Sequence, residues 1–233
     1  MQENNRPIIV LGLSGGMDSA ALLGFLLEQG AIVHCCMFTY GSKHGAHEVA
    51  AAIKLIDFYE KKLGKERVYD HYIDLTPAFK EFSSNLLQTG GAIPEGHYQA
   101  ENMKLTVVPN RNMIFASVMA GLAESLEAEF VALGVHTGDH AIYPDCRPEF
   151  VKALDLAVYE ATNKQVQILT PLMNLDKAGI LKIGLNQTTP VPYELTRTCY
   201  KDQVLPCGVC GSCNERIEAF SQLGLVDPVA YDL

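Results

Sequence analysis

Residues 8–19, IIVLGLSGGMDS, contain the turn that decides the fold of this chain. Residues 8–13 form a nearly continuous apolar run, which is typical of a parallel strand covered on both faces. A glycine-rich turn follows at 14–16, and residues 17–29 then place apolar side chains at helical spacing. Such a turn leaves backbone N–H groups unpaired at the start of a helix, where they bind phosphate. The stretch therefore predicts an α/β fold with an anion site after its first strand.

Two glycines between a strand and a helix often make only a tight connection, so the turn needs further support as a binding site. The hydroxyls of Ser14 and Ser19 provide it, and Asp18 would repel phosphate unless a cation such as Mg2+ lay between them. The turn lacks the Gly-Lys-Ser/Thr of a Walker loop and does not fit the dinucleotide pattern GxGxxG. A phosphate site of a different type is therefore the preferred interpretation.

The composition is that of a globular protein and excludes several classes. The 233 residues are 48% hydrophobic and 19% charged, which suits one domain or one domain with a small appendage. A net charge of -9 argues against a nucleic-acid partner and favours small-molecule substrates. The N-terminal residues lack the pattern of a secretory signal, and no apolar run has membrane-spanning length. We therefore expect a cytoplasmic protein with no membrane partner.

The later apolar runs alternate with helical patterns, which is typical of an open, doubly wound parallel sheet. We expect strands at 31–38, 68–75, 130–135 and 166–170, and helices at 47–63, 77–82, 113–126, 148–161, 177–185 and 214–223. Residues 83–106 break the pattern and form either a lid over a substrate or a surface excursion. The predicted division is a phosphate-binding domain at 1–185 and a C-terminal segment at 186–233 packed on it.

Polar residues gather after two predicted strands, at 39–44 and 136–149, where binding loops lie in open α/β sheets. In the second group, His136, Asp139 and His140 offer metal ligands. Substrate binding is the preferred interpretation there, because a complete four-ligand set lies elsewhere in the chain.

The entrance to the predicted helix at 113–126 carries two further polar residues. Asn112 immediately before the helix can serve as its cap. Arg111 beside it either satisfies backbone carbonyls or binds an anion with its planar fork.

The metal-ligand set is Cys199, Cys207, Cys210 and Cys213, with the spacing C-x7-C-x2-C-x2-C. Thiolates two residues apart can converge on one ion, and the glycines between them allow the tight turn. Four sulfur ligands leave no open position, so a tetrahedral Zn2+ here is structural; an iron–sulfur cluster is the alternative. Seven cysteines, four of them clustered, suit a reducing compartment better than a disulfide framework does. We expect the ion to hold the irregular part of the C-terminal segment against the domain.

Five motifs together resemble the 7-cyano-7-deazaguanine synthase (QueC) family, within the superfamily of N-type ATP pyrophosphatases, or PP-loop enzymes. They are SGGMDS at 14–19, FTYGSKH at 38–44, VPNRN at 108–112, YPDCRPEF at 143–150, and TCY with CGVCGSC within 198–213. SGGMDS alone resembles only the superfamily, and the last two motifs make the narrower match. The resemblance implies an adenine nucleotide alpha hydrolase-like fold and an ATP-dependent ligase that forms a carbon–nitrogen bond, with ATP, Mg2+ and Zn2+ as cofactors.

The reaction implied by this resemblance converts 7-carboxy-7-deazaguanine, ammonia and ATP to 7-cyano-7-deazaguanine (preQ0) in the queuosine pathway. Adenylation makes a carboxylate oxygen a leaving group, ammonia displaces AMP to give an amide, and a second activation allows dehydration to the nitrile. The residues implied for ATP are Leu13, Ser14, Gly15, Gly16, Met17, Asp18 and Ser19, and those for catalysis are Ser14, Asp18, Ser19, Lys43 and Arg111. Those implied for the substrate are Tyr40, His44, Arg111, Asp139, Tyr143, Asp145 and Arg147. The carboxylate of Asp145 is suited to accept hydrogen bonds from a guanine-like N–H edge. We also expect that the protein can form a homodimer.

Residues 39–44 depart from the family pattern, which commonly reads Asp-Tyr-Gly-Gln-Arg-His there. Lys43 keeps the charge of that arginine without its planar fork. The alternative functions are a related enzyme that stops at the amide or joins the base to another acceptor, and a tRNA-modifying PP-loop enzyme. A zinc-ribbon module that only binds a partner is the alternative without catalysis.

Overall fold

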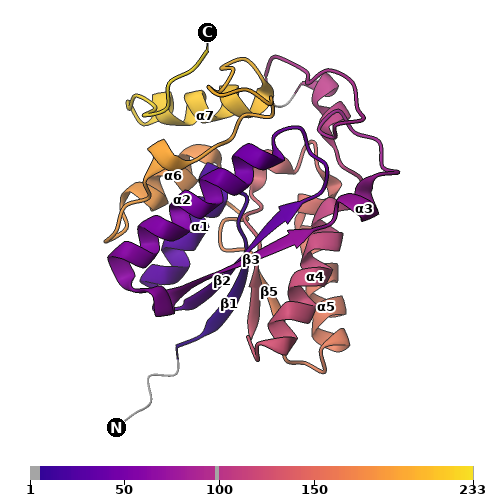
Figure 1. The fold of residues 1–233 in the computed structure, drawn as a ribbon, viewed down its shortest axis with the longest axis vertical. Coiled ribbons are helices and arrows are strands. Elements are labelled where there is room, and N and C mark those ends of the chain that lie inside the picture. The colour runs from indigo at the N-terminus through magenta and orange to yellow at the C-terminus, as the bar shows by residue number, and fades with distance from the viewer. Residues whose placement is uncertain (1–5, 98–99, 233) are drawn as a thin grey trace.

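The computed structural model describes residues 6–97 and 100–232, and a five-stranded parallel sheet lies at its centre (Figure 1). The strands are β1 (Ile8–Gly12), β2 (Ile32–Thr39), β3 (Val68–Asp74), β4 (Phe130–Ala132) and β5 (Gln167–Leu169). The α-helices are α1 (Met17–Glu28), α2 (Gly45–Leu63), α3 (Thr76–Phe79), α4 (Arg111–Ser125), α5 (Pro148–Ala161), α6 (Lys177–Leu185) and α7 (Gly211–Gln222). The predicted α/β class with a parallel sheet is confirmed.

The strand order β3-β2-β1-β4-β5 places the first strand in the middle of the sheet, and each pairing is parallel. The chain winds outward from β1 to β3 and then returns to the other side of β1. The connections after β1 and β4 therefore diverge at the carboxyl ends of these strands. In open α/β sheets such a divergence opens a crevice that binds ligands.

Helices cover both faces of the sheet, which explains the uninterrupted apolar run in the first strand (Figure 1). Ile9 and Leu11 pack into the core under α1, α2 and α6, whereas Val10 packs into the core on the side of α4 and α5. Because successive side chains of a strand point to opposite faces, every position must be apolar when both faces are covered.

Several element boundaries differ from those predicted. Helix α2 begins at Gly45, two residues before the predicted residue 47, and α7 begins at Gly211 rather than 214. Helix α3 ends at Phe79 rather than 82, and β4 ends at Ala132 rather than 135. Apolar periodicity fails to mark these ends, because the starts of α2 and α7 lie in polar, glycine-containing stretches positioned by tertiary contacts.

The described part of residues 83–106 packs onto the domain through buried apolar side chains. Leu86, Leu87 and Met103 are 1%, 3% and 1% exposed. Isolated antiparallel bridges join Leu87 to Ser42 and Glu95 to Cys210, so the segment touches both the loop after β2 and the cysteine region. The described part of this segment is therefore packed and is not a loose surface excursion.

The C-terminal segment packs against the domain through both backbone and side chains. The backbone N–H of Arg197 donates to the carbonyl of Gly15 at 2.8 Å. Tyr193 and Phe220 join the core under α1 and α6. The predicted boundary after residue 185 stays a prediction. In the described part of the chain, every helix is too short or too polar to cross a membrane.

Candidate active site

A cavity of about 220 Å³ lies at the carboxyl ends of β1, β2 and β4. Four groups of residues line it: Gly12, Leu13, Ser14, Gly16, Asp18 and Ser19 from the first turn; Tyr40, His44 and Glu48 after β2; Arg111, Asn112 and Phe115 from α4; and Asp139, Tyr143, Lys177, Tyr200 and Glu215 from later segments. The cavity thus joins the glycine-rich turn to the two polar loops that follow β2 and β4.

The turn after β1 is built around Gly15, whose φ is +76°. A Cβ at this position would lie 2.5 Å from the carbonyl oxygen of Glu48 and 2.8 Å from the backbone nitrogen of Ala52, so only glycine fits. The hydroxyls of Ser14 and Ser19 lie 3.1 Å apart. No side chain caps the N-terminus of α1, whose N-cap is Gly16. Its backbone N–H groups and the two hydroxyls are donors of the kind that bind an anion at a helix N-terminus.

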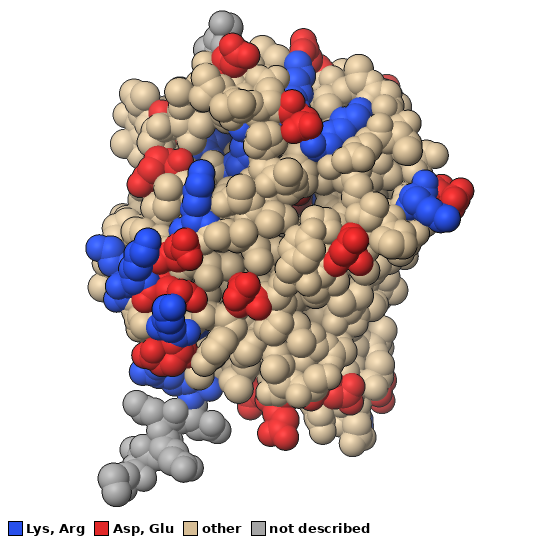
Figure 2. Space-filling view, viewed as in Figure 1, with Lys and Arg blue, Asp and Glu red and all other residues tan. Residues whose placement is uncertain are grey.

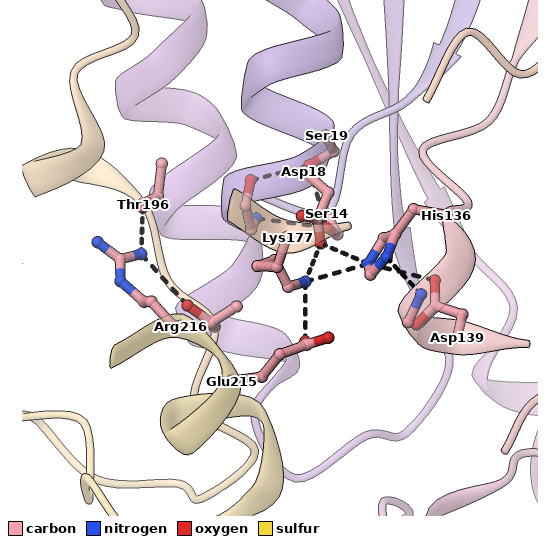
Figure 3. A network of polar contacts seen from close by, with 12 residues as sticks. Ser14, Asp18, Ser19, His136, Asp139, Lys177, Thr196, Glu215 and Arg216 are labelled. Carbon is pink, nitrogen blue, oxygen red and sulfur yellow. Dashed lines mark hydrogen bonds and ion pairs between the residues drawn. The ribbon is translucent and has the colours of Figure 1, made fainter. Parts of the chain in front are cut away.

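A network of charged groups lies beside this turn (Figure 3). Lys177, the first residue of α6, places its Nζ 2.6 Å from Oδ2 of Asp18 and 3.0 Å from Glu215. The same Nζ lies 3.2 Å from Nε2 of His136. His136 in turn lies 3.6 Å from carboxylate oxygens of both Asp18 and Asp139. Residues from four distant segments therefore converge beside the phosphate turn.

Burial and charge pairing oppose each other in this network. Burial alone would raise the pKa of Asp18, but the charges of Lys177 and His136 hold it well below its ordinary value. Burial alone would lower the pKa of Lys177, but Asp18 and Glu215 hold it well above its ordinary value. For Glu215, burial outweighs the attraction of Lys177 and raises the pKa. Lys177 and Asp18 therefore remain charged at neutral pH.

Helix α6 is capped by Asp176, whose side chain accepts a hydrogen bond of 2.7 Å from the N–H of Gly179. On α7, Arg216 is 2% exposed and pairs with Asp227 at 2.7 Å. It also donates to the carbonyl of Tyr193 at 3.0 Å. These contacts fix the two helices that carry Lys177 and Glu215 into the cavity wall.

Arg111 lines the cavity from another element, at the first position of α4. Its guanidinium donates to the hydroxyl of Tyr40 at 3.2 Å and lies 5.8 Å from the centre of that ring. Burial raises the pKa of Tyr40 and of Tyr143, so both phenols remain protonated. The hydroxyl of Tyr143 lies 2.8 Å from Thr106 and 3.3 Å from the hydroxyl of Tyr200. This wall therefore offers neutral hydroxyls around one cation.

The predicted asparagine cap of this helix is wrong. Asn112 lies inside the first turn of α4, and Oδ2 of Asp145 accepts a 2.9 Å hydrogen bond from its backbone N–H. Asp145 thereby caps the helix that carries Arg111, and its predicted contact with a guanine-like edge stays a prediction. The N–H group at the helix start is bonded by Asp145, a residue distant in sequence, and not by the side chain of a neighbouring asparagine.

The remaining sequence-predicted residues divide by their place relative to the cavity. Those that line it are Leu13, Ser14, Gly16, Asp18, Ser19, Tyr40, His44, Arg111, Asp139 and Tyr143, whereas Gly15, Met17, Lys43, Asp145 and Arg147 are outside its lining. Met17 is fully buried in the core. Lys43 donates to the carbonyl of Gly90 at 3.1 Å, and exposed Arg147 donates to the carbonyl of His140 at 3.0 Å. The roles of these residues in binding stay predictions.

Sequence reasoning missed several residues of the cavity. Lys177 and Glu215 were outside the predicted site, as were Cys36, Asn112 and Tyr200. A signal for Lys177 was present, because it directly follows the capping Asp176 and, apart from Lys182, opens an apolar helix. Glu215 and Tyr200 lie within two residues of Cys213 and Cys199, and the cysteine spacing predicts metal ligands but no cavity-lining residues.

The four cysteines converge as their spacing predicts. Their sulfur atoms all lie within 4.8 Å of one another, and the side chains are at most 4% exposed. Backbone N–H groups point at two of the sulfurs: Cys207 donates to Cys199 and Cys210 donates to Cys207, both at 3.3 Å. Such donors stabilise thiolate charge, so the arrangement fits a closed four-sulfur zinc site. Among residues 6–97 and 100–232 this is the one group of three or more potential ligands placed to hold a metal.

Comparison with known proteins assigns the family. The model of the family described as "Queuosine biosynthesis protein QueC" matches residues 8–224. The chain belongs to this family.

Two curated relatives cover almost the whole chain. A 7-cyano-7-deazaguanine synthase from Marinomonas sp. is 44% identical over 225 residues, which is 96% of this chain and 97% of the relative. One from Caldicellulosiruptor saccharolyticus is 41% identical over 228 residues, 98% of this chain and 96% of the relative. Among solved structures, the NMN synthetase from Francisella tularensis is similar over 80% of this chain and 63% of that chain, at 15% identity and a TM-score of 0.47. A likeness that distant says nothing about the site.

Proposed function

We propose that this protein converts 7-carboxy-7-deazaguanine and ammonia to 7-cyano-7-deazaguanine at the expense of ATP, as a carbon–nitrogen ligase. The observation that carries the proposal is that one cavity is lined both by a phosphate turn and by a half-buried arginine, Arg111. A phosphate turn suits ATP, and an arginine suits a carboxylate. The name of the relatives described above is consistent with this substrate.

In this proposal the phosphates of ATP lie on the turn at Ser14 and Ser19, at the N-terminus of α1. Lys177 neutralises charge that develops on the pyrophosphate as it leaves. Asp18 and Asp139 line the same region, and their carboxylates would supply oxygen ligands to a Mg2+ ion bound with the phosphates. Mg2+ would offset phosphate charge there.

The deazaguanine lies toward α4, where Arg111 holds the carboxylate. One carboxylate oxygen attacks the α-phosphate, and pyrophosphate leaves. Ammonia then replaces AMP at the carbon to give the amide. Activation of the amide oxygen by a second ATP, followed by loss of AMP, gives the nitrile. Because both activations need the same geometry, one phosphate turn serves both.

The zinc site has a structural role in this proposal. Tyr200, which lines the cavity, follows directly after Cys199. Four sulfur ligands leave no position for substrate or water. An ion held there would fix the segment that forms the wall around Tyr200, without taking part in the reaction.

A nucleic-acid substrate has less support. Figure 2 shows acidic and basic side chains interspersed on one face of the molecule, without a continuous basic surface there. The net charge of -9 also argues against binding to a nucleic acid.

The test is incubation of the purified protein with ATP, Mg2+, ammonium and 7-carboxy-7-deazaguanine, with mass detection of nucleotide and base products. We expect the nitrile, with two AMP formed for each nitrile. One AMP and an accumulating amide would identify an amide-forming enzyme instead, and a conjugate would differ in mass from both. A parallel reaction with 7-deazaguanine, which lacks the carboxylate, should form no AMP.

A further inference from the structure

His44 lines the cavity at the start of α2, and the reaction scheme above assigns it no role. Its side chain is 2% exposed, and its Nε2 lies 3.4 Å from Oε1 of Glu48, one helical turn further on. Its Nδ1 is also buried and has no hydrogen-bond partner within the described residues. A carboxylate beside Nε2 favours the tautomer with its proton there, which leaves the lone pair on Nδ1. A buried nitrogen with a free lone pair is a candidate base.

The surroundings of His44 place it close to the atoms that react. The first turns of α2 pack directly on the phosphate turn, because a Cβ on Gly15 would meet the carbonyl oxygen of Glu48 at 2.5 Å. The ring centre of Tyr200 lies 5.5 Å from that of His44 on another side. In an adenylated substrate, a single oxygen joins the reacting carbon to the α-phosphate. A carbon so close to the phosphate turn is also close to the start of α2.

Two titratable side chains lie next to His44 in the described residues, on different elements. Glu48 faces it from α2, and Tyr200 faces it from the C-terminal segment. The neighbouring Lys43 turns away to the carbonyl of Gly90. His47, the next imidazole on α2, is paired with Asp202 at 3.0 Å.

We propose that His44 is the general base for the nitrogen chemistry and that Glu48 positions its ring; this rests on the proposed function. In amide formation, the nitrogen of ammonia bonds to the adenylated carbon and the carbon–oxygen bond to AMP breaks, its electron pair leaving with AMP. One N–H proton passes to Nδ1 of His44. When the amide oxygen is adenylated, pyrophosphate leaves and one N–H proton is released to water, so the adenylated amide keeps a single N–H proton. That last proton passes to Nδ1 as the carbon–nitrogen double bond becomes triple and AMP leaves. His44 gives up each proton to water before it accepts the next one.

The two halves of the reaction separate this role from simple substrate binding. Adenylation of the carboxylate needs no proton transfer from nitrogen, and it is measured alone as exchange of labelled pyrophosphate into ATP when the acid is present and ammonia is absent. In His44→Gln we expect this exchange to stay within about threefold of the unaltered protein, whereas nitrile formation falls by roughly 10²–10⁴-fold. His47→Gln is the matched control, because it removes an imidazole from the same helix outside the cavity lining, and both activities should be unchanged.

A second nucleophile provides a further readout. Hydroxylamine is uncharged near neutral pH and traps acyl-adenylates as hydroxamates. In His44→Gln, hydroxamate formation should fall much less than amide formation. Glu48→Gln should show the same split between exchange and synthesis, with a smaller loss of synthesis, because the ring remains and only its orientation is lost.

Three outcomes would overturn the role of His44: nitrile formation near normal in His44→Gln, a parallel loss of exchange and synthesis in a folded His44→Gln protein, or amide and hydroxamate lost equally. If His44→Gln does not fold, Glu48→Gln decides, and a parallel loss of exchange and synthesis there counts against the proposal. Failure of the unaltered protein to exchange pyrophosphate with the acid would instead reject the proposed function.

Discussion

Two regions of the molecule bury polar atoms in opposite ways. One is the charged wall, formed by Asp18, His136, Asp139, Lys177 and Glu215, and the other is the four-cysteine cluster. Lys177 lies between Asp18 and Glu215 and borders a cavity of about 220 Å³, so its partners can change when an anion binds. The four sulfurs lie within 4.8 Å of one another and leave space only for an ion. We therefore expect the first region to take part in chemistry and the second to stabilise the fold.

The two regions are nevertheless joined by one short segment. The N–H of Arg197 bonds to Gly15 in the phosphate turn at 2.8 Å, and Cys199 follows two residues later. Disruption of the cluster should therefore act first on stability, whereas disruption of the charged wall should act first on turnover. The following variants test that contrast.

The largest effect is expected for Cys210→Ser, which removes one sulfur of the closed set. We expect the free energy of unfolding to fall by more than about 4 kcal/mol, because a lost structural metal is among the few single changes of that size. Urea unfolding together with zinc content measures it. Cys35→Ala, which removes a fully buried thiol from β2, is the control and should cost about 1–2 kcal/mol. Equal losses in the two variants would remove the architectural role of the cluster.

Asp18→Asn should act next most strongly, on turnover. We expect kcat/KM to fall about 10²–10³-fold, equivalent to roughly 3–4 kcal/mol of transition-state stabilisation, because the carboxylate is needed beside the phosphates. Steady-state assay of AMP release measures this loss. The exposed Asp57 on α2 supplies the control Asp57→Asn, which should be neutral. An Asp18→Asn protein that is destabilised but catalytically near normal would reverse the assignment of the two regions.

A smaller effect concerns the pH dependence of stability. The pKa of Asp18 is depressed from 3.8 in the folded protein, so its stabilisation is present above that pH and is lost as the pH falls further. The pKa of Lys177 is raised from 10.5, so its stabilisation is present below that pH and is lost above it. Between pH 7 and about pH 3, Lys177→Met should lose less stability than the unaltered protein, by on the order of 1–3 kcal/mol.

Urea unfolding at the two pH values measures this difference. Lys182→Met, at an exposed position near the end of α6, serves as the control and should follow the unaltered protein. Identical acid sensitivity in the Lys177 variant would show that the ion pair contributes no net stability in the folded state.

The smallest effect is expected for Arg147→Gln. Arg147 is exposed and donates to the carbonyl of His140, so we expect stability to change by less than about 0.5 kcal/mol. KM for the deazaguanine should also remain within about threefold, since the side chain is outside the cavity lining. Measurement of KM for the deazaguanine and for ATP checks this prediction. A tenfold rise confined to the deazaguanine would restore the substrate role that the sequence predicts.

The contrast between Asp18 and Asp145 explains how far sequence reasoning reached. Asp18 lies in a turn whose strand, glycines and helix are adjacent in the chain, so local rules placed it correctly beside the cavity. Asp145 lies in an equally informative motif, but its partner is the N–H of Asn112 on another helix. Which of several polar side chains caps a distant helix depends on how the helix and loop pack, and no local rule supplies that.

By itself, the sequence determined the parallel α/β fold, the phosphate turn at 14–19 and the convergence of four cysteines, because each follows from apolar periodicity or from contacts between near neighbours. Tertiary packing was needed to pair Lys177 with Asp18 and Glu215, and to leave Nδ1 of His44 without a hydrogen-bond partner among the described residues. The physical reason is that these partners lie far apart in the chain. Strand order and helix packing bring them together, and burial then makes their charges and lone pairs matter.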